Sequence, residues 1–114
     1  MKYMLQVRFN GADLTINELP VEQRQAIFSE FEAIGRLAGV LDGNQLQPIS
    51  TAKTVRAPQG RPHIAHASAV DSSVALDGYY LYDAPDLEAA LAVAARIPAA
   101  RFGGTVEVRP VVER

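Results

Sequence analysis

The C-terminal third of the chain constrains its fold more than any other segment. Residues 78–83 alternate in the manner of a strand, and residues 87–97 follow with the three-to-four-residue spacing of an amphipathic helix. Asp86 is suited to cap the start of that helix, because its carboxylate can accept a hydrogen bond from a free backbone N–H group. Pro98 ends the helix, since proline has no N–H group and clashes with the preceding turn. Two glycines then lead into a last strand, so this segment predicts a helix packed on a sheet.

The N-terminal half predicts a second unit of the same kind. Residues 2–9 alternate between apolar and polar side chains, which is typical of a strand with one face in the core. A helix over residues 20–38 follows, with Pro20 in its first turn, where the missing N–H group costs nothing. Both helices carry one apolar stripe, as expected of helices that cover a sheet. The predicted stripes are Ile27, Phe28, Phe31, Ile34 and Ala38 in the first helix and Leu87, Ala90, Leu91, Ala94 and Ile97 in the second.

The segment between these two units predicts short strands and turns. Residues 44–48 form a short polar strand or a loop. Residues 51–57 and 61–67 can pair as a β-hairpin, because the intervening residues 58–60 are Pro-Gln-Gly and favour a turn. Residues 68–73 are polar and small and predict a loop.

The order of these elements predicts one α+β domain over residues 1–114. Two β-α-β halves on one sheet give a ferredoxin-like βαββαβ arrangement, here with an extra β-hairpin. In that arrangement the first strand lies between the last strand and strand 78–83. Both helices cover the same face of the sheet.

Composition argues against several classes of function. The formal net charge is −2, and Lys and Arg are scattered, so the basic patch typical of nucleic-acid binding is missing. The chain has no cysteine, which removes disulfides and thiolate zinc sites, and no histidine–carboxylate cluster has the spacing of metal ligands. The N-terminus is too polar for a signal peptide, and no apolar run approaches the roughly 20 residues of a membrane span. We therefore expect a cytoplasmic protein with no cofactor, no nucleic-acid partner and no membrane partner.

The sheet face without helices is the predicted binding surface. Adjacent strands should bring Gln6 and Arg8 beside Glu107 and Arg109. Two guanidinium groups would suit a carboxylate or another small anion, which they bind in a two-pronged manner. The alternative is an ordinary ladder of Arg and Glu, or a salt bridge between two copies. Strand 78–83 adds Tyr80 to this set. The candidate substrate-binding residues are therefore Arg8, Gln6, Tyr80, Glu107 and Arg109.

The same face predicts self-association. It carries Met4 and one of the pairs Tyr80/Tyr82 or Tyr79/Leu81, beside the charged residues. Packing two such faces together would bury the apolar side chains in a two-fold homodimer and enclose a polar pocket. We therefore expect a homodimer through the open sheet face.

His63 and His66 are the only histidines and the candidate catalytic bases. Imidazole titrates near neutral pH, so either could act as a general base, with Asp71 or Asp77 to orient it. The two histidines lie three residues apart in a predicted strand and point to opposite faces, which argues against a shared metal ion. The alternative is that both are surface residues without a role. The candidate catalytic set is His66, His63 and Asp71.

Five segments resemble the YCII-related (DGPF-domain) family, in matching order along nearly the whole chain: Lys2–Leu5, Ala52–Arg56, Gly78–Leu81, Asp86–Leu91 and Val106–Val111. The resemblance implies a ferredoxin-like fold that dimerises sheet to sheet, as a dimeric α/β barrel. It leaves the biochemical role mostly unassigned. Some relatives resemble small lyases or dehydrochlorinases that use a His–Asp pair, and others are associated with extracytoplasmic-function sigma factors.

The signature motif of that family is degenerate in this chain. Residues 66–69, His-Ala-Ser-Ala, occupy the position of the Asp-Gly-Pro-Phe sequence, and the acidic position that follows falls on Asp71. Helix 20–38 contains no histidine that could supply the His–Asp pair. Either His66 with Asp71 replaces that pair, or the chain is not an enzyme of that kind.

Two functions of different classes therefore remain. The first is a small dimeric protein that binds an anionic or aromatic metabolite at the sheet face, with a cofactor-independent lyase or isomerase step if a histidine reaches it. The second is a non-enzymatic regulator or interaction protein linked to a sigma factor. A fold whose pocket has filled in is a further alternative.

Overall fold

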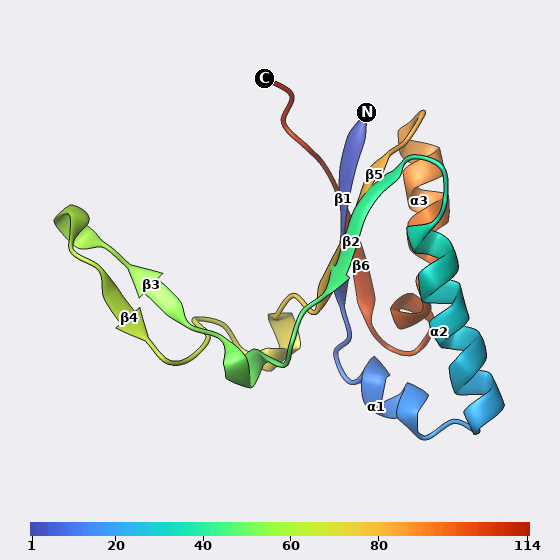
Figure 1. The fold of residues 1–114 in the computed structure, drawn as a ribbon, viewed down its shortest axis with the longest axis horizontal. Helices are drawn as coiled ribbons and strands as arrows, with labels where there is room; N and C mark the ends of the chain where they lie inside the picture. The colour runs from blue at the N-terminus through green and yellow to red at the C-terminus, as the bar shows by residue number, and fades with distance from the viewer.

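The computed structural model describes residues 1–114 as a four-stranded sheet with helices on one face and a separate two-stranded ribbon (Figure 1). The predicted α+β class is confirmed. The strands are β1 (Lys2–Arg8), β2 (Val40–Gln45), β3 (Thr54–Arg56), β4 (His63–Ala65), β5 (Gly78–Asp83) and β6 (Thr105–Pro110). The helices are α1 (Ala12–Asn17), α2 (Val21–Gly35) and α3 (Leu87–Arg96), with short 3-10 turns at Ile49–Thr51, Pro58–Gly60, Ser72–Val74 and Pro98–Arg101.

The main sheet has the order β2-β5-β1-β6, and all its pairs are antiparallel. Strand β1 lies between β5 and β6, as the sequence predicts. Leu5 in the middle of β1 pairs with Tyr80 on one side and with Val108 on the other. The centre of the sheet is therefore built on the N-terminal strand.

The core lies between this sheet and the helices α2 and α3. Alternate residues of β1, namely Tyr3, Leu5 and Val7, are buried, whereas those between them are only partly covered. Such alternation is the period of a strand with one face against helices. The helices contribute Ile34, Ala90 and Val93 to the core, and Ile97, which directly follows α3, adds a fourth side chain.

Helix α3 begins where the sequence predicts, but its buried face differs from the prediction. The Asp86 carboxylate accepts a hydrogen bond from the N–H group of Ala89 at 2.8 Å, which confirms the cap. Leu87 and Leu91 were predicted to be buried, yet each is 49% exposed. The small side chains of the helix lie against the sheet and let it approach closely, which turns both leucines to solvent. The buried residues of this stretch are Ala90, Val93, Ala94 and Ile97.

Two elements near the β2 edge also differ from the prediction. The chain forms helix α1 directly after an Asn-Gly turn, between the predicted strand 2–9 and the predicted helix 20–38, where no helix was expected. Strand β2 spans Val40–Gln45 and not residues 44–48. Its centre, Asp42-Gly43-Asn44, has low intrinsic preference for strands, so backbone pairing with β5 overrides local preference there. Helix α2 accordingly ends at Gly35, and Gly39, with φ of 91°, lies in the turn into β2.

The β3–β4 ribbon projects from the sheet on the side away from the helices (Figure 1). Its two strands pair only with each other. None of residues 47–70 is buried. None of the three helices combines the length and apolarity that crossing a membrane requires.

Candidate functional site

The open sheet face gathers four of the residues selected from the sequence. Gln6 pairs with Glu107 across β1 and β6, and Arg109 and Arg8 lie on neighbouring rungs of the same two strands. Strand β5 adds Tyr79 and Leu81 to this face, because Tyr79 pairs with Gln6. These side chains therefore lie on one face of the sheet within a single chain.

Arg8 on this face already has partners within the chain. Its Nη1 donates to Glu107 Oε2 at 3.0 Å, and its Nε donates to the backbone oxygen of Val74 at 3.1 Å. An anion bound to Arg8 would have to compete with Glu107. Arg109 makes no ion pair, so one guanidinium on this face is available where two were expected.

Tyr80 was predicted on the open face of the sheet, but its side chain lies on the face that the helices cover. Its hydroxyl donates to the backbone oxygen of Phe31 in α2 at 2.9 Å. Burial raises the pKa of the Tyr80 phenol above its usual value near 10, and the Glu30 carboxylate adds to this effect. Alternation fixes which tyrosines share a face, but only the packing of α2 decides which face that is.

The candidate catalytic residues lie on or beside the projecting ribbon. His63 is in β4, His66 follows it, and both are exposed, as is Asp71. His66 makes no hydrogen bond with Asp71, and neither histidine lines a cavity described below. Because the ribbon extends away from the sheet, a single chain brings neither imidazole to Arg8 or Arg109 (Figure 1).

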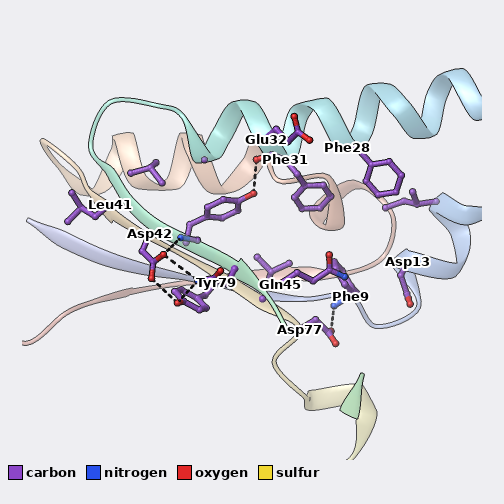
Figure 2. A pocket seen from close by; sticks show the side chains of 18 of the residues that line it. Phe9, Asp13, Phe28, Phe31, Glu32, Leu41, Asp42, Gln45, Asp77 and Tyr79 are labelled. Atoms are coloured by element: carbon purple, nitrogen blue, oxygen red, sulfur yellow. Dashed lines mark hydrogen bonds between the residues drawn. The ribbon is translucent and has the colours of Figure 1, made fainter. Parts of the chain in front are cut away.

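A cavity of about 710 Å³ lies between α2, α1 and the β2 edge of the sheet (Figure 2). Its apolar part is aromatic: Phe28 and Phe31 point from α2 toward the sheet, and Phe9 lies opposite them. Phe28 is 54% exposed, although the helical pattern predicted it in the core. A half-exposed phenylalanine at a cavity is available to a ligand as well as to the fold.

A glycine in the edge strand makes room for the wall of this cavity. Gly43 of β2 pairs with Tyr80 of β5, and the tyrosine ring lies over the glycine. A Cβ atom at position 43 would come within 2.5 Å of Tyr80 Cδ1. The hydrogen bond to Phe31 holds the ring in place, so Gly43 allows Tyr80 to form one side of the cavity.

Four of the 19 lining residues are acidic, namely Asp13, Glu32, Asp42 and Asp77, and none is Lys, Arg or His. The Asp42 carboxylate accepts from the Tyr79 hydroxyl at 2.9 Å and so points to the open face of the sheet, whereas Asp77 accepts from the N–H group of Phe9 at 2.7 Å (Figure 2). Asp13 has no hydrogen bond or ion pair, and the fourth, Glu32, is 3.7 Å from the exposed Arg36. No group of three potential metal ligands occurs in the chain. The arrangement suits an organic ligand with a cationic or hydrogen-bond-donating end.

Of the candidate catalytic and substrate-binding residues chosen from the sequence, only Tyr80 lines this cavity. Asp13 lies between the predicted strand 2–9 and the predicted helix 20–38, and Asp42 lies outside the predicted strands. The sequence did contain one signal for this cavity. Phe28 and Phe31 stand three residues apart on α2, and the predicted apolar stripe contains more large side chains than the helix buries. The residues that α2 buries are Ile27 and Ile34. An excess of aromatic residues on one helix face marks surface that the chain alone does not cover.

We expect Tyr80→Phe to lower the free energy of unfolding by about 1 kcal/mol at neutral pH, because the Phe31 carbonyl loses its donor. In the wild type, stability should fall as pH rises above about 10, since the phenol ionises first in the unfolded chain. The variant lacks this group and should decline less steeply. Denaturant melts from about pH 8 to 11 measure both slopes. Equal slopes for wild type and variant would show that the phenol is not held protonated by the fold.

Comparison with known families gives one match. The model described as "YCII-related domain" matches residues 1–114, the whole chain, and confirms the resemblance that the sequence carries. Comparison with the curated proteins gives no match.

Proposed function

Since this chain belongs to the family of YCII-related domains, a membership that assigns no reaction, we propose that it binds a small aromatic molecule in the cavity between α2 and β2. The ligand carries a cationic or hydrogen-bond-donating end. One observation carries the proposal: aromatic side chains line a cavity of about 710 Å³ whose lining includes four acidic residues and no basic residue. Pockets of this size and lining are typical of small-molecule sites.

The ligand would bind with its ring among the aromatic side chains and its donor at the carboxylates. Phe28, Phe31 and Tyr80 offer an apolar wall that stacks against a ring. A cation close to aromatic faces and carboxylates is attracted by both. Asp13 is the best anchor, because no group within the chain occupies its carboxylate. The expected ligand is therefore an arylalkylamine, that is, an aromatic ring with an ammonium group on a short aliphatic chain.

The proposal includes a dimer with a ferredoxin-like sheet. The order β2-β5-β1-β6, with both long helices on one face, supports that arrangement. Two open faces packed together would form the dimeric α/β barrel expected from the family. Met4, Leu81 and the partly covered Gln6, whose Oε1 is buried without a hydrogen-bond partner, support an interface there.

A pair of matched ligands tests the site. Phenethylamine and hydrocinnamate share a ring and a two-carbon chain but differ in the sign of charge. We expect the amine to bind and to raise the melting temperature, with affinity reduced about fivefold in Asp13→Asn, the value of one partly exposed ion pair. Glu18→Gln is the matched control, because Glu18 lies beside α1 but outside the cavity.

The opposite preference would overturn the proposal. If hydrocinnamate binds and the amine does not, the Arg109 side of the sheet is the better site. If phenethylamine, hydrocinnamate and a broad set of arylalkylamines all fail to bind, the result favours a regulatory protein. The next experiment would then be a search for its protein partner.

A further inference from the structure

The ribbon formed by β3 and β4 has no partner within its own chain. We call residues 47–70 the arm. Two-stranded ribbons are at best marginally stable alone in water and need a third strand or a packed surface. Val55 and Ile64 pair across the arm and are 61% and 60% exposed. An exposed apolar pair on an isolated ribbon marks a contact surface.

Charge divides the chain into two unlike parts. Of its 11 Lys and Arg residues three lie in the arm, namely Lys53, Arg56 and Arg61, whereas all 13 Asp and Glu residues lie outside it. The arm therefore carries +3 and the remainder −5. Opposite charge on separate parts of one chain favours contact between the arm of one copy and the body of another.

The chain also exposes more surface than a compact protein of its size. Its accessible surface is 7741 Å², whereas a compact monomer of this mass exposes about 6,100 Å². Its radius of gyration is 16.0 Å, against about 13 Å for a compact domain of this length. The excess of about 1,600 Å² per chain is in the range that each copy buries in an obligate dimer.

We propose that the arm of each copy packs across the open sheet face of a second copy, so that two arms are exchanged in one dimer. The arm projects on the side of that face (Figure 1). Its Val55–Ile64 pair would cover Leu81 on the β5 side of the other copy's open face, beside the part of that face that meets the second sheet, and its basic residues would lie near the exposed carboxylates of that copy. This inference rests on the proposed dimer and names the element that holds it together.

Apolar disruption of the arm is the first test. Light scattering on the full chain should give twice the 12.3 kDa chain mass. Val55→Asp/Ile64→Asp should weaken the dimer by at least about 100-fold, because two symmetric contacts are lost at once. Circular dichroism should stay unchanged, since β3 and β4 pair only with each other and the arm adds no residue to the core. Val112→Asp, which alters an apolar residue that is 70% exposed elsewhere, is the matched control.

Cross-linking locates the contact. The chain has no cysteine, so an introduced cysteine is the only thiol in each chain and every disulfide cross-link forms between introduced cysteines. A mixture of Ile64→Cys and Leu81→Cys chains should give cross-linked pairs at least about ten times as often as Val21→Cys with Leu81→Cys, because Val21 lies on the helix side. If the wild type is a monomer, both this inference and the proposed dimer fail. If it is a dimer that survives the double Asp variant without cross-linking at position 64, the arm exchange is overturned and the sheet-face dimer stands.

Discussion

Leu5→Ala is expected to lower the free energy of unfolding by about 3 to 5 kcal/mol, the range for a large-to-small change where the core cannot collapse. Leu5 is fully buried in the middle of the central strand, between Tyr80 and Val108. Helices α2 and α3 both pack over this position through the core that it joins. Rigid strands on both sides prevent the space from closing, so the cavity that remains adds its own cost.

Urea or thermal melts measure this loss. A change of this size should lower the melting temperature by more than about 10 °C in a domain of this length. Leu14→Ala is the matched control, because Leu14 is 66% exposed and should change stability by less than about 0.5 kcal/mol. Similar losses for the two variants would contradict the position of Leu5 at the centre of the core.

Gly43→Ala is expected to cost about 2 to 3 kcal/mol and to abolish ligand binding, as overpacking against a fixed ring does. The added Cβ atom would lie 2.5 Å from Tyr80 Cδ1 and 2.9 Å from Tyr80 Cε1. The hydrogen bond to Phe31 opposes rotation of the ring away from the clash. Either the strand β2 or the ring must therefore move, and both form walls of the cavity.

A second glycine supplies the control for this variant. At Gly35, which also faces Tyr80, an added Cβ atom would lie 3.9 Å from the ring, an ordinary contact. Gly35→Ala should therefore be neutral or slightly stabilising, since alanine is the better helix former. In a Tyr80→Ala background the cost of Gly43→Ala should nearly vanish, because the two changes share one contact. An undiminished cost in that background would show that the ring is not the obstacle.

Much of the sheet and one helix cap could be predicted from local sequence. The alternation of Tyr3, Leu5 and Val7 determined the buried face of β1, because each position repeats the same environment. Asp86 capped α3 as predicted, since capping depends only on residues within one turn. Features governed by short-range geometry were therefore accessible without the structure.

The candidate site could not be predicted in the same way. Strand β2 contains Asp42 and Gly43, so local preference opposes it, and only its pairing with β5 forms it. The cavity depends on the gap that Phe28, Phe31 and this edge strand leave between them, which no single segment encodes. Whether a histidine reaches the sheet face was equally out of reach of local sequence, because it depends on the direction of the hairpin, which extends from the body within one chain.

Mapping by nuclear magnetic resonance during a titration with phenethylamine tests the central claim most directly. If phenethylamine binds between α2 and β2, the chemical-shift changes will concentrate at Phe28, Phe31 and Tyr80. Hydrocinnamate will leave the same signals unchanged. Shifts at Gln6, Arg8 and Arg109, seen with hydrocinnamate and not with the amine, would contradict the account and place the ligand site on the open face of the sheet.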